Sequence, residues 1–135
     1  MDPVTQTISA TVKAESADAM PSIPGIQLHE GLARFAGDQS RYSHWLRDFV
    51  HHGPAAAEQI RQAASNGSPE AASKLAHALK GRTGMLGMAE LYSIAMSLET
   101  CLVNSEPSAF WLDELDRATA DMCTDIVAAL GGPDD

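Results

Sequence analysis

The chain has 135 residues, of which 44% are hydrophobic and 5% aromatic, and its formal net charge at pH 7 is −9. This length predicts one compact domain whose core needs neither a metal nor a cross-link. The negative charge argues against binding to nucleic acid or to an anionic membrane surface. No stretch has the roughly 20 apolar residues of a membrane span, and the N-terminus lacks the features of a secretory signal. We therefore expect a soluble, cytoplasmic domain whose partners are proteins.

The first 21 residues mix small and polar side chains without apolar periodicity, so residues 1–21 are expected to be a flexible linker. The domain itself should span residues 22–131, followed by a disordered tail over 132–135. Plentiful Ala, Leu and Met with few β-branched residues favour helices. Leu28, Leu32 and Phe35 lie at helical spacing and predict a short first helix that Gly37 stops.

A long second helix is expected to begin after Asp38, a good N-cap residue, and to end at Asn66-Gly67. Its apolar positions keep one helical phase across Gly53-Pro54, which predicts a kink there and not a break. These apolar positions are Tyr42, Trp45, Leu46, Phe49, Ala56, Ile60 and Ala63. We interpret the three aromatic residues among them as core or helix-contact residues.

Three more helices complete the predicted fold. Ser68 as N-cap, Pro69 at the first helical position and Glu70 in the first turn should start a helix that stops at Gly87. A fourth should end near residues 104–107, and Ser108 should cap a fifth that ends at residues 131–132. Short connections imply antiparallel neighbours. The predicted fold is all-α, an antiparallel up-down four-helix bundle over residues 38–130 with a short extra N-terminal helix.

The helix that carries His77 has an unusual face. At about 100° per residue, Gly81 lies about 40° and Gly84 about 20° from His77, and Lys80 lies about 60° away. Leucines 75, 79 and 86 fall on the opposite side. Each interior glycine costs roughly 1 kcal/mol of helix stability relative to alanine. Two such glycines beside an outward-pointing imidazole suggest that another molecule must approach His77 closely.

This run resembles the phosphoacceptor motif of histidine phosphotransfer (HPt) domains, in which His-x-Leu-Lys-Gly is followed by small residues and further glycines. The departures at Arg82, Thr83 and Met85 lie away from the acceptor face. The resemblance spans residues 22 to 130 and includes Ile23-Pro24-Gly25-Ile26, Gly31 to Gly37, Tyr42 and Leu46 to Phe49. It is closest to the domains that end bacterial hybrid sensor kinases.

The resemblance implies that His77 is the phosphorylated residue and that Lys80 is the cation beside the phosphoryl group. It implies that Gly81 and Gly84 leave clearance for a docking receiver domain, and we place Ser73 and Lys74 on the same docking face. A neutral imidazole, available because a free histidine has a pKa near 6.5, would attack the acyl phosphate of a receiver aspartate.

The same resemblance sets expectations for partners and cofactors. The partners are receiver domains of a hybrid kinase or a response regulator, with no nucleic acid and no direct membrane contact, and the isolated domain is expected to be a monomer. No kinase activity and no cofactor are expected on this chain, because it has no nucleotide-binding motif and the Mg²⁺ belongs to the receiver. A parent chain could be a sensor kinase anchored in the inner membrane.

Two other functions remain open at this stage: a helical adaptor or inhibitory module that is never phosphorylated, and a cofactor-binding bundle. His44, His51 and His52 are close in sequence, but adjacent helical residues point about 100° apart, so no metal site is expected. Cys101 and Cys123 occupy apolar positions of two helices and are expected to be plain buried thiols.

Overall fold

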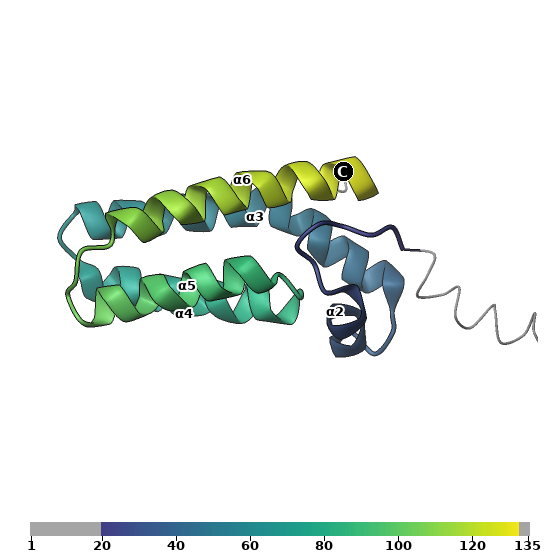
Figure 1. The fold of residues 1–135 in the computed structure, drawn as a ribbon, viewed down its shortest axis with the longest axis horizontal. Helices are drawn as coiled ribbons and strands as arrows, with labels where there is room; N and C mark the ends of the chain where they lie inside the picture. The colour runs from purple at the N-terminus through teal and green to yellow at the C-terminus, as the bar shows by residue number, and fades with distance from the viewer. Residues whose placement is uncertain (1–19, 133–135) are drawn as a thin grey trace, which may run out of the picture.

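The computed structural model describes residues 20–132, which form a bundle of helices. The elements are α2 (Leu28–Arg34), α3 (Gln39–Ser65), α4 (Pro69–Met85), α5 (Ala89–Val103) and α6 (Ala109–Leu130). Helices α3 to α6 lie side by side along the long axis, and α2 packs across one end (Figure 1). The order of packing is cyclic, α3 against α4, α4 against α5, α5 against α6 and α6 against α3. The predicted four-helix bundle with a short extra N-terminal helix is confirmed.

Helix α3 runs through the Gly53-Pro54 pair without a break. This was predicted from its apolar positions, which keep the same helical phase on both sides of the pair. Asp38 caps it, because its carboxylate accepts a hydrogen bond from the backbone N–H of Arg41 at 3.0 Å. Gly53 is buried, and a Cβ there would lie 2.6 Å from the ring of Phe49. The glycine is thus required by packing of Phe49, and Pro54 costs one backbone donor without ending the helix.

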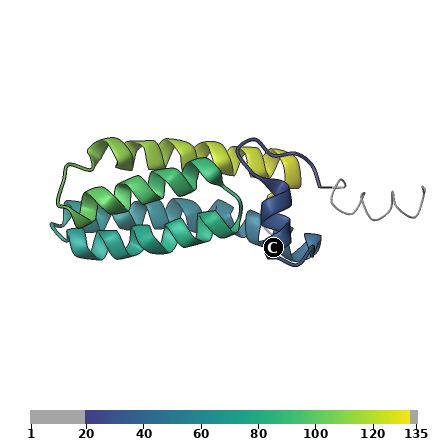
Figure 2. The same cartoon turned by 60° about the horizontal axis from the view of Figure 1, so that its bottom comes forward.

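The corner between α4 and α5 is fixed from two sides. Gly87 has φ +79, and the N–H of Met88 donates to the Thr83 carbonyl at 2.9 Å, which closes a Schellman turn. The Gly87 carbonyl accepts from the N–H of Gln27 at 2.8 Å, and the Tyr42 hydroxyl donates to the Leu86 carbonyl at 2.7 Å. These bonds tie the C-terminal end of α4 to α3 and to the segment before α2. Figure 2 shows α2 and this segment at the end of the bundle where α4 turns into α5.

The core fills the space between the four long helices. Its largest fully buried aliphatic side chains include Leu46, Ile60, Leu91, Leu98, Leu115 and Ile126. Met20, which lies inside the segment expected to be a linker, is also buried in this core, so packing begins earlier than the composition suggested. The rest of that segment, residues 1–19, and residues 133–135 of the expected tail lie outside the described residues.

Some local expectations are wrong. Ser68 and Ser108 occupy the N-cap positions of α4 and α6, but neither side chain makes a capping hydrogen bond. Trp45 is 38% exposed and stacks edge-on with the His44 ring, in contrast to the buried Tyr42 and Phe49.

Between residues 20 and 132 no helix is both long and apolar enough to cross a bilayer.

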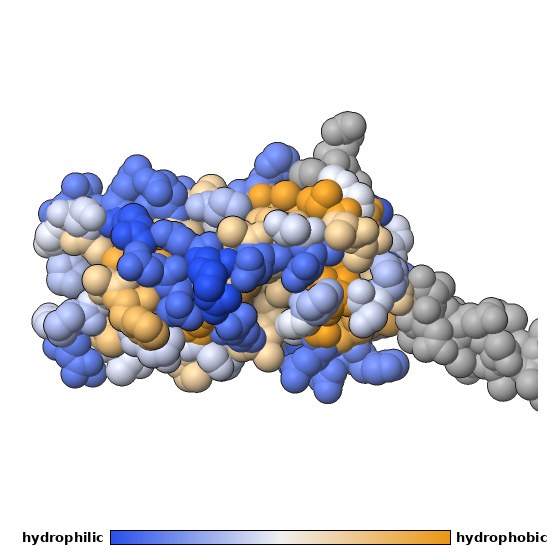
Figure 3. Space-filling view, turned by 45° about the horizontal axis from the view of Figure 1, so that its top comes forward, coloured by the Kyte–Doolittle hydropathy of each residue, from blue (hydrophilic) through white to orange (hydrophobic). Residues whose placement is uncertain are grey.

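The side of the molecule that carries α6 is mainly hydrophilic. Figure 3 shows a band of hydrophilic side chains across this face, with smaller hydrophobic areas beside it. Arg117 on α6 is within 3.2 Å of three carboxylates, those of Glu90, Glu114 and Asp121. Arg61 of α3 bridges two further α6 carboxylates, Asp113 and Asp116. The pair with Glu90 connects α6 to α5 and those of Arg61 connect α3 to α6, whereas the pairs with Glu114 and Asp121 lie within α6. All lie on a solvated surface, where each contributes little to stability.

Candidate functional site

His77 lies in the middle of α4 and points away from the core. Its side chain is 67% exposed, as the helical phase predicts. The opposite face of α4 is anchored by Ala72, Ala76, Leu79 and Thr83, which recur at helical spacing and are all buried. The hydroxyl of Thr83 donates to the Leu79 carbonyl at 3.0 Å, so this buried polar residue is satisfied within its own helix.

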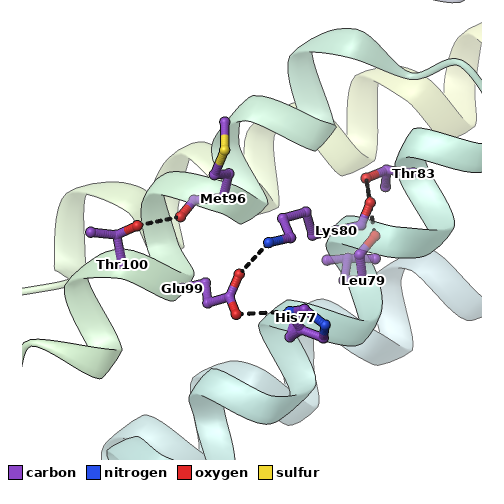
Figure 4. Close-up of polar contacts among 7 residues, drawn as sticks. All are labelled: His77, Leu79, Lys80, Thr83, Met96, Glu99 and Thr100. Atoms are coloured by element: carbon purple, nitrogen blue, oxygen red, sulfur yellow. Dashed lines mark hydrogen bonds and ion pairs between the residues drawn. The ribbon is translucent and has the colours of Figure 1, made fainter.

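A carboxylate from the neighbouring helix joins the imidazole to the lysine. Glu99 of α5 lies with one oxygen 2.8 Å from Nδ1 of His77 and the other 2.8 Å from Nζ of Lys80 (Figure 4). Its side chain is 21% exposed, and that of Lys80 is 24% exposed. The structure therefore brings together the two predicted site residues, His77 and Lys80, through a third that the sequence analysis did not identify.

The charges of this cluster support one another. The hydrogen bond from Lys80, and secondarily that from His77, holds the pKa of Glu99 below its ordinary value of 4.5. The hydrogen bond to Glu99 in turn raises the pKa of Lys80 above 10.5. At neutral pH the pair is therefore a carboxylate and an ammonium group.

The ionised state of Glu99 determines which imidazole nitrogen is free. A carboxylate only accepts hydrogen bonds, so Nδ1 of His77 must be the donor and carry a proton. In the neutral imidazole the other nitrogen, Nε2, then holds the lone pair. The arrangement thus presents Nε2 of His77 to solvent as a nucleophile.

The two glycines on this face differ in their surroundings. Gly81 is exposed, and a Cβ there would have no neighbour within 4 Å. A Cβ at Gly84 would lie 3.0 Å from the ring of Tyr92 on α5. Gly81 leaves open space beside His77, whereas Gly84 lets the Tyr92 ring pack close to α4. The role of both glycines in docking stays a prediction.

Ser73 and Lys74 lie one turn before His77. The Ser73 hydroxyl donates to the Glu70 carbonyl at 2.8 Å, and Lys74 is exposed. Both residues line a shallow hollow that Leu102 and Val103 of α5 close on the other side. Both residues lie within about 60° of His77 around α4, and their role in docking a receiver stays a prediction.

Apolar side chains accompany the acceptor residues on α5. Tyr92, Met96 and Val103 share a helix face with Glu99 and are 37%, 41% and 63% exposed, and Met85 at the end of α4 is 45% exposed. Tyr92, Met96 and Val103 have the helical spacing to Glu99 that puts them on one face of α5, and the packing of α5 against α4 turns this face toward the His77 side of α4.

The remaining candidates from the sequence stay apart from this site. His52 pairs with Asp48 at 2.8 Å on α3, and within residues 20–132 no group of three His, Cys, Asp or Glu side chains is placed to hold a metal ion. Cys101 and Cys123 were expected to be buried thiols, but both are only half-buried. Burial raises the pKa of the Cys123 thiol, which disfavours its reactive thiolate.

Comparison with known families agrees with the geometry. The Hpt domain family model matches residues 44–129, which include α4, α5 and nearly all of α3 and α6. No curated protein and no solved structure matches the chain.

Proposed function

The chain belongs to the Hpt domain family, whose members are phosphotransfer modules of phosphorelays without kinase activity of their own, and we propose that His77 is its phosphoacceptor. On this proposal His77 accepts a phosphoryl group from a receiver-domain aspartate and passes it to another receiver aspartate. The observation that carries the assignment is the single carboxylate of Glu99 that accepts from Nδ1 of His77 at 2.8 Å and binds Lys80.

The transfer step follows from that arrangement. Nε2 of His77 attacks the phosphorus of the aspartyl phosphate, an N–P bond forms, and the acyl O–P bond breaks with its electron pair staying on the receiver carboxylate. Positive charge develops on the imidazole as the N–P bond forms, because Nδ1 keeps its proton. Glu99 lies within hydrogen-bond distance of that proton and stabilises the charge. Lys80 has three ammonium hydrogens and can bind phosphoryl oxygens while it keeps its bond to Glu99.

Docking is proposed on the seam between α4 and α5. Gly81 leaves the approach to His77 open, and the exposed Tyr92, Met96 and Val103 supply apolar contact area beside it. Hpt domains interact with receiver domains. We propose that here the receivers belong to a bacterial hybrid sensor kinase, a response regulator or both, that the isolated domain is a cytoplasmic monomer, and that Mg²⁺ is held by the receiver and no cofactor by this chain.

The test compares two histidine variants in phosphotransfer from phosphorylated receivers. His77→Gln should accept no acid-labile phosphate, because it removes the nucleophile and keeps the size of the side chain. His51→Gln, an equally conservative change at an exposed histidine of α3, should accept phosphate as the wild type does. Labelling of the His77→Gln protein would contradict the assignment. A wild type that no receiver phosphorylates would favour the adaptor function instead.

A further inference from the structure

A hollow of about 490 Å³ lies on the acceptor face, next to His77 and toward α2. Lys80, Gly81 and Gly84 of α4 line one side, Tyr92 of α5 lines another, and Arg34 of α2 closes the end. The three α4 residues, Lys80, Gly81 and Gly84, lie roughly 5 to 10 Å from His77 along the helix axis, at about 1.5 Å of rise per residue. A standard protein interface buries about 800 Å² on each partner. A protein docked on His77 therefore covers this hollow as well.

The charge of the hollow is opposite to that of the chain. The sequence has 18 acidic residues and 9 Lys or Arg residues, yet two cations and no carboxylate line this hollow. Lys80 is already bound to Glu99. Arg34 is exposed and makes no ion pair with any residue between 20 and 132, and Glu30, one turn earlier on α2, does not line the hollow. Arg34 is thus the cation available to a partner.

We propose that this hollow receives an acidic side chain of the docking receiver domain and that Arg34 selects receivers that carry this side chain. The inference rests on the proposed function and extends it to partner choice. The occupant is a carboxylate because the charged residues that line the hollow, Arg34 and Lys80, are cations. It belongs to the receiver because Lys80 lines the hollow and also binds Glu99 at the acceptor site. A guanidinium binds a carboxylate through two parallel hydrogen bonds, which makes the contact selective as well as attractive.

The position of Arg34 suits this role. The segment before α2 is held to the α4–α5 corner by the bond from Gln27 to Gly87 and by the Ile26–Met88 bridge. Gly31 of α2 faces Tyr42 so closely that a Cβ there would overlap the Tyr42 hydroxyl. Helix α2 is therefore fixed relative to α4, and Arg34 reaches the hollow from a rigid support.

The test measures transfer from a panel of phosphorylated receiver domains to three variants. Each rate is divided by the rate at which phosphoramidate, a small donor that needs no docking, labels His77 in the same variant. For the preferred receiver this ratio should fall about tenfold in Arg34→Glu and less in Arg34→Gln. The matched control Arg41→Glu makes the same charge change at an exposed arginine of α3 outside the hollow and should keep the wild-type ratio.

A charge swap identifies the receiver's side. Reversing one surface carboxylate of the preferred receiver to lysine should restore transfer to Arg34→Glu and weaken transfer to the wild type. Two results would overturn this inference and leave the proposed function intact. One is an equal ratio in the wild type and both Arg34 variants, and the other is that none of the charge-reversed receivers restores transfer to Arg34→Glu. If phosphoramidate labels His77 but no receiver does, the proposed function fails and the inference fails with it. Should Arg34→Glu not fold, Arg34→Gln decides the same comparison.

Discussion

Replacement of Gly81 separates the stability of α4 from its function. Gly81 lies inside the helix, and a Cβ there would meet nothing within 4 Å. A change to alanine should therefore stabilise the fold by about 1 kcal/mol through helix propensity alone. For a domain of this size that raises the Tm by about 4 °C. Gly81→Leu should be nearly as stable, because leucine is almost as good a helix former as alanine.

The same substitutions should slow phosphotransfer. Reacting atoms must approach to about 3 to 3.5 Å, and a misplacement of about 1 Å can cost on the order of 100-fold in rate. A leucine at position 81 projects from the open surface one turn beyond His77, where the receiver must lie. We expect a loss on the order of 100-fold for Gly81→Leu and a much smaller loss for Gly81→Ala.

The assay combines thermal melting with receiver-to-His77 transfer rates. Ala78→Leu is the matched control, since Ala78 is exposed on the same helix but points about 100° away from His77. Wild-type transfer rates in a stably folded Gly81→Leu protein would refute the steric argument. A lower Tm for Gly81→Ala would show that the space beside Gly81 is not open.

The remaining predictions concern neighbouring contacts. Gly84→Ala should gain less stability than Gly81→Ala, because its methyl group would press on the Tyr92 ring 3.0 Å away; equal gains in Tm would show that the ring moves freely. Glu99→Gln should slow transfer about two- to fivefold, the effect of a partly exposed pair worth 0.5 to 1 kcal/mol, and an unchanged rate would remove Glu99 from the mechanism. Lys80→Ala should slow transfer and reduce its salt dependence while melting like the wild type, whereas equal rates at every salt concentration would leave Lys80 a surface lysine. Burial raises the pKa of Tyr42 from 10.0 to about 12. The contribution of its neutral phenol to the free energy of unfolding is therefore complete below pH 10 and is lost as the pH rises toward 12. Denaturant unfolding should show this loss in the wild type and not in Tyr42→Phe.

The helices could be predicted because their signals are local. Apolar periodicity reaches across about four residues, and the ends of the helices are set by Asp38, Pro69, Gly37, Gly67 and Gly87, whose backbone or side-chain preferences act within one turn. Capping by the side chains of Ser68 and Ser108 was not realised, because a short local bond competes with several alternatives that the flanking turns decide.

The candidate site divides in the same way. The outward direction of His77, and the presence of Lys80 and Gly81 on its face, follow from the rotation of one helix and were set by the sequence alone. Glu99, the Tyr92 ring against Gly84, and Arg34 beside the hollow come from other helices, so their places depend on the register of α5 and α2 against α4. That register results from the packing of many side chains at once, and no single segment of the chain encodes it. Tertiary structure therefore decided which nitrogen of His77 is free and which charge stands beside it.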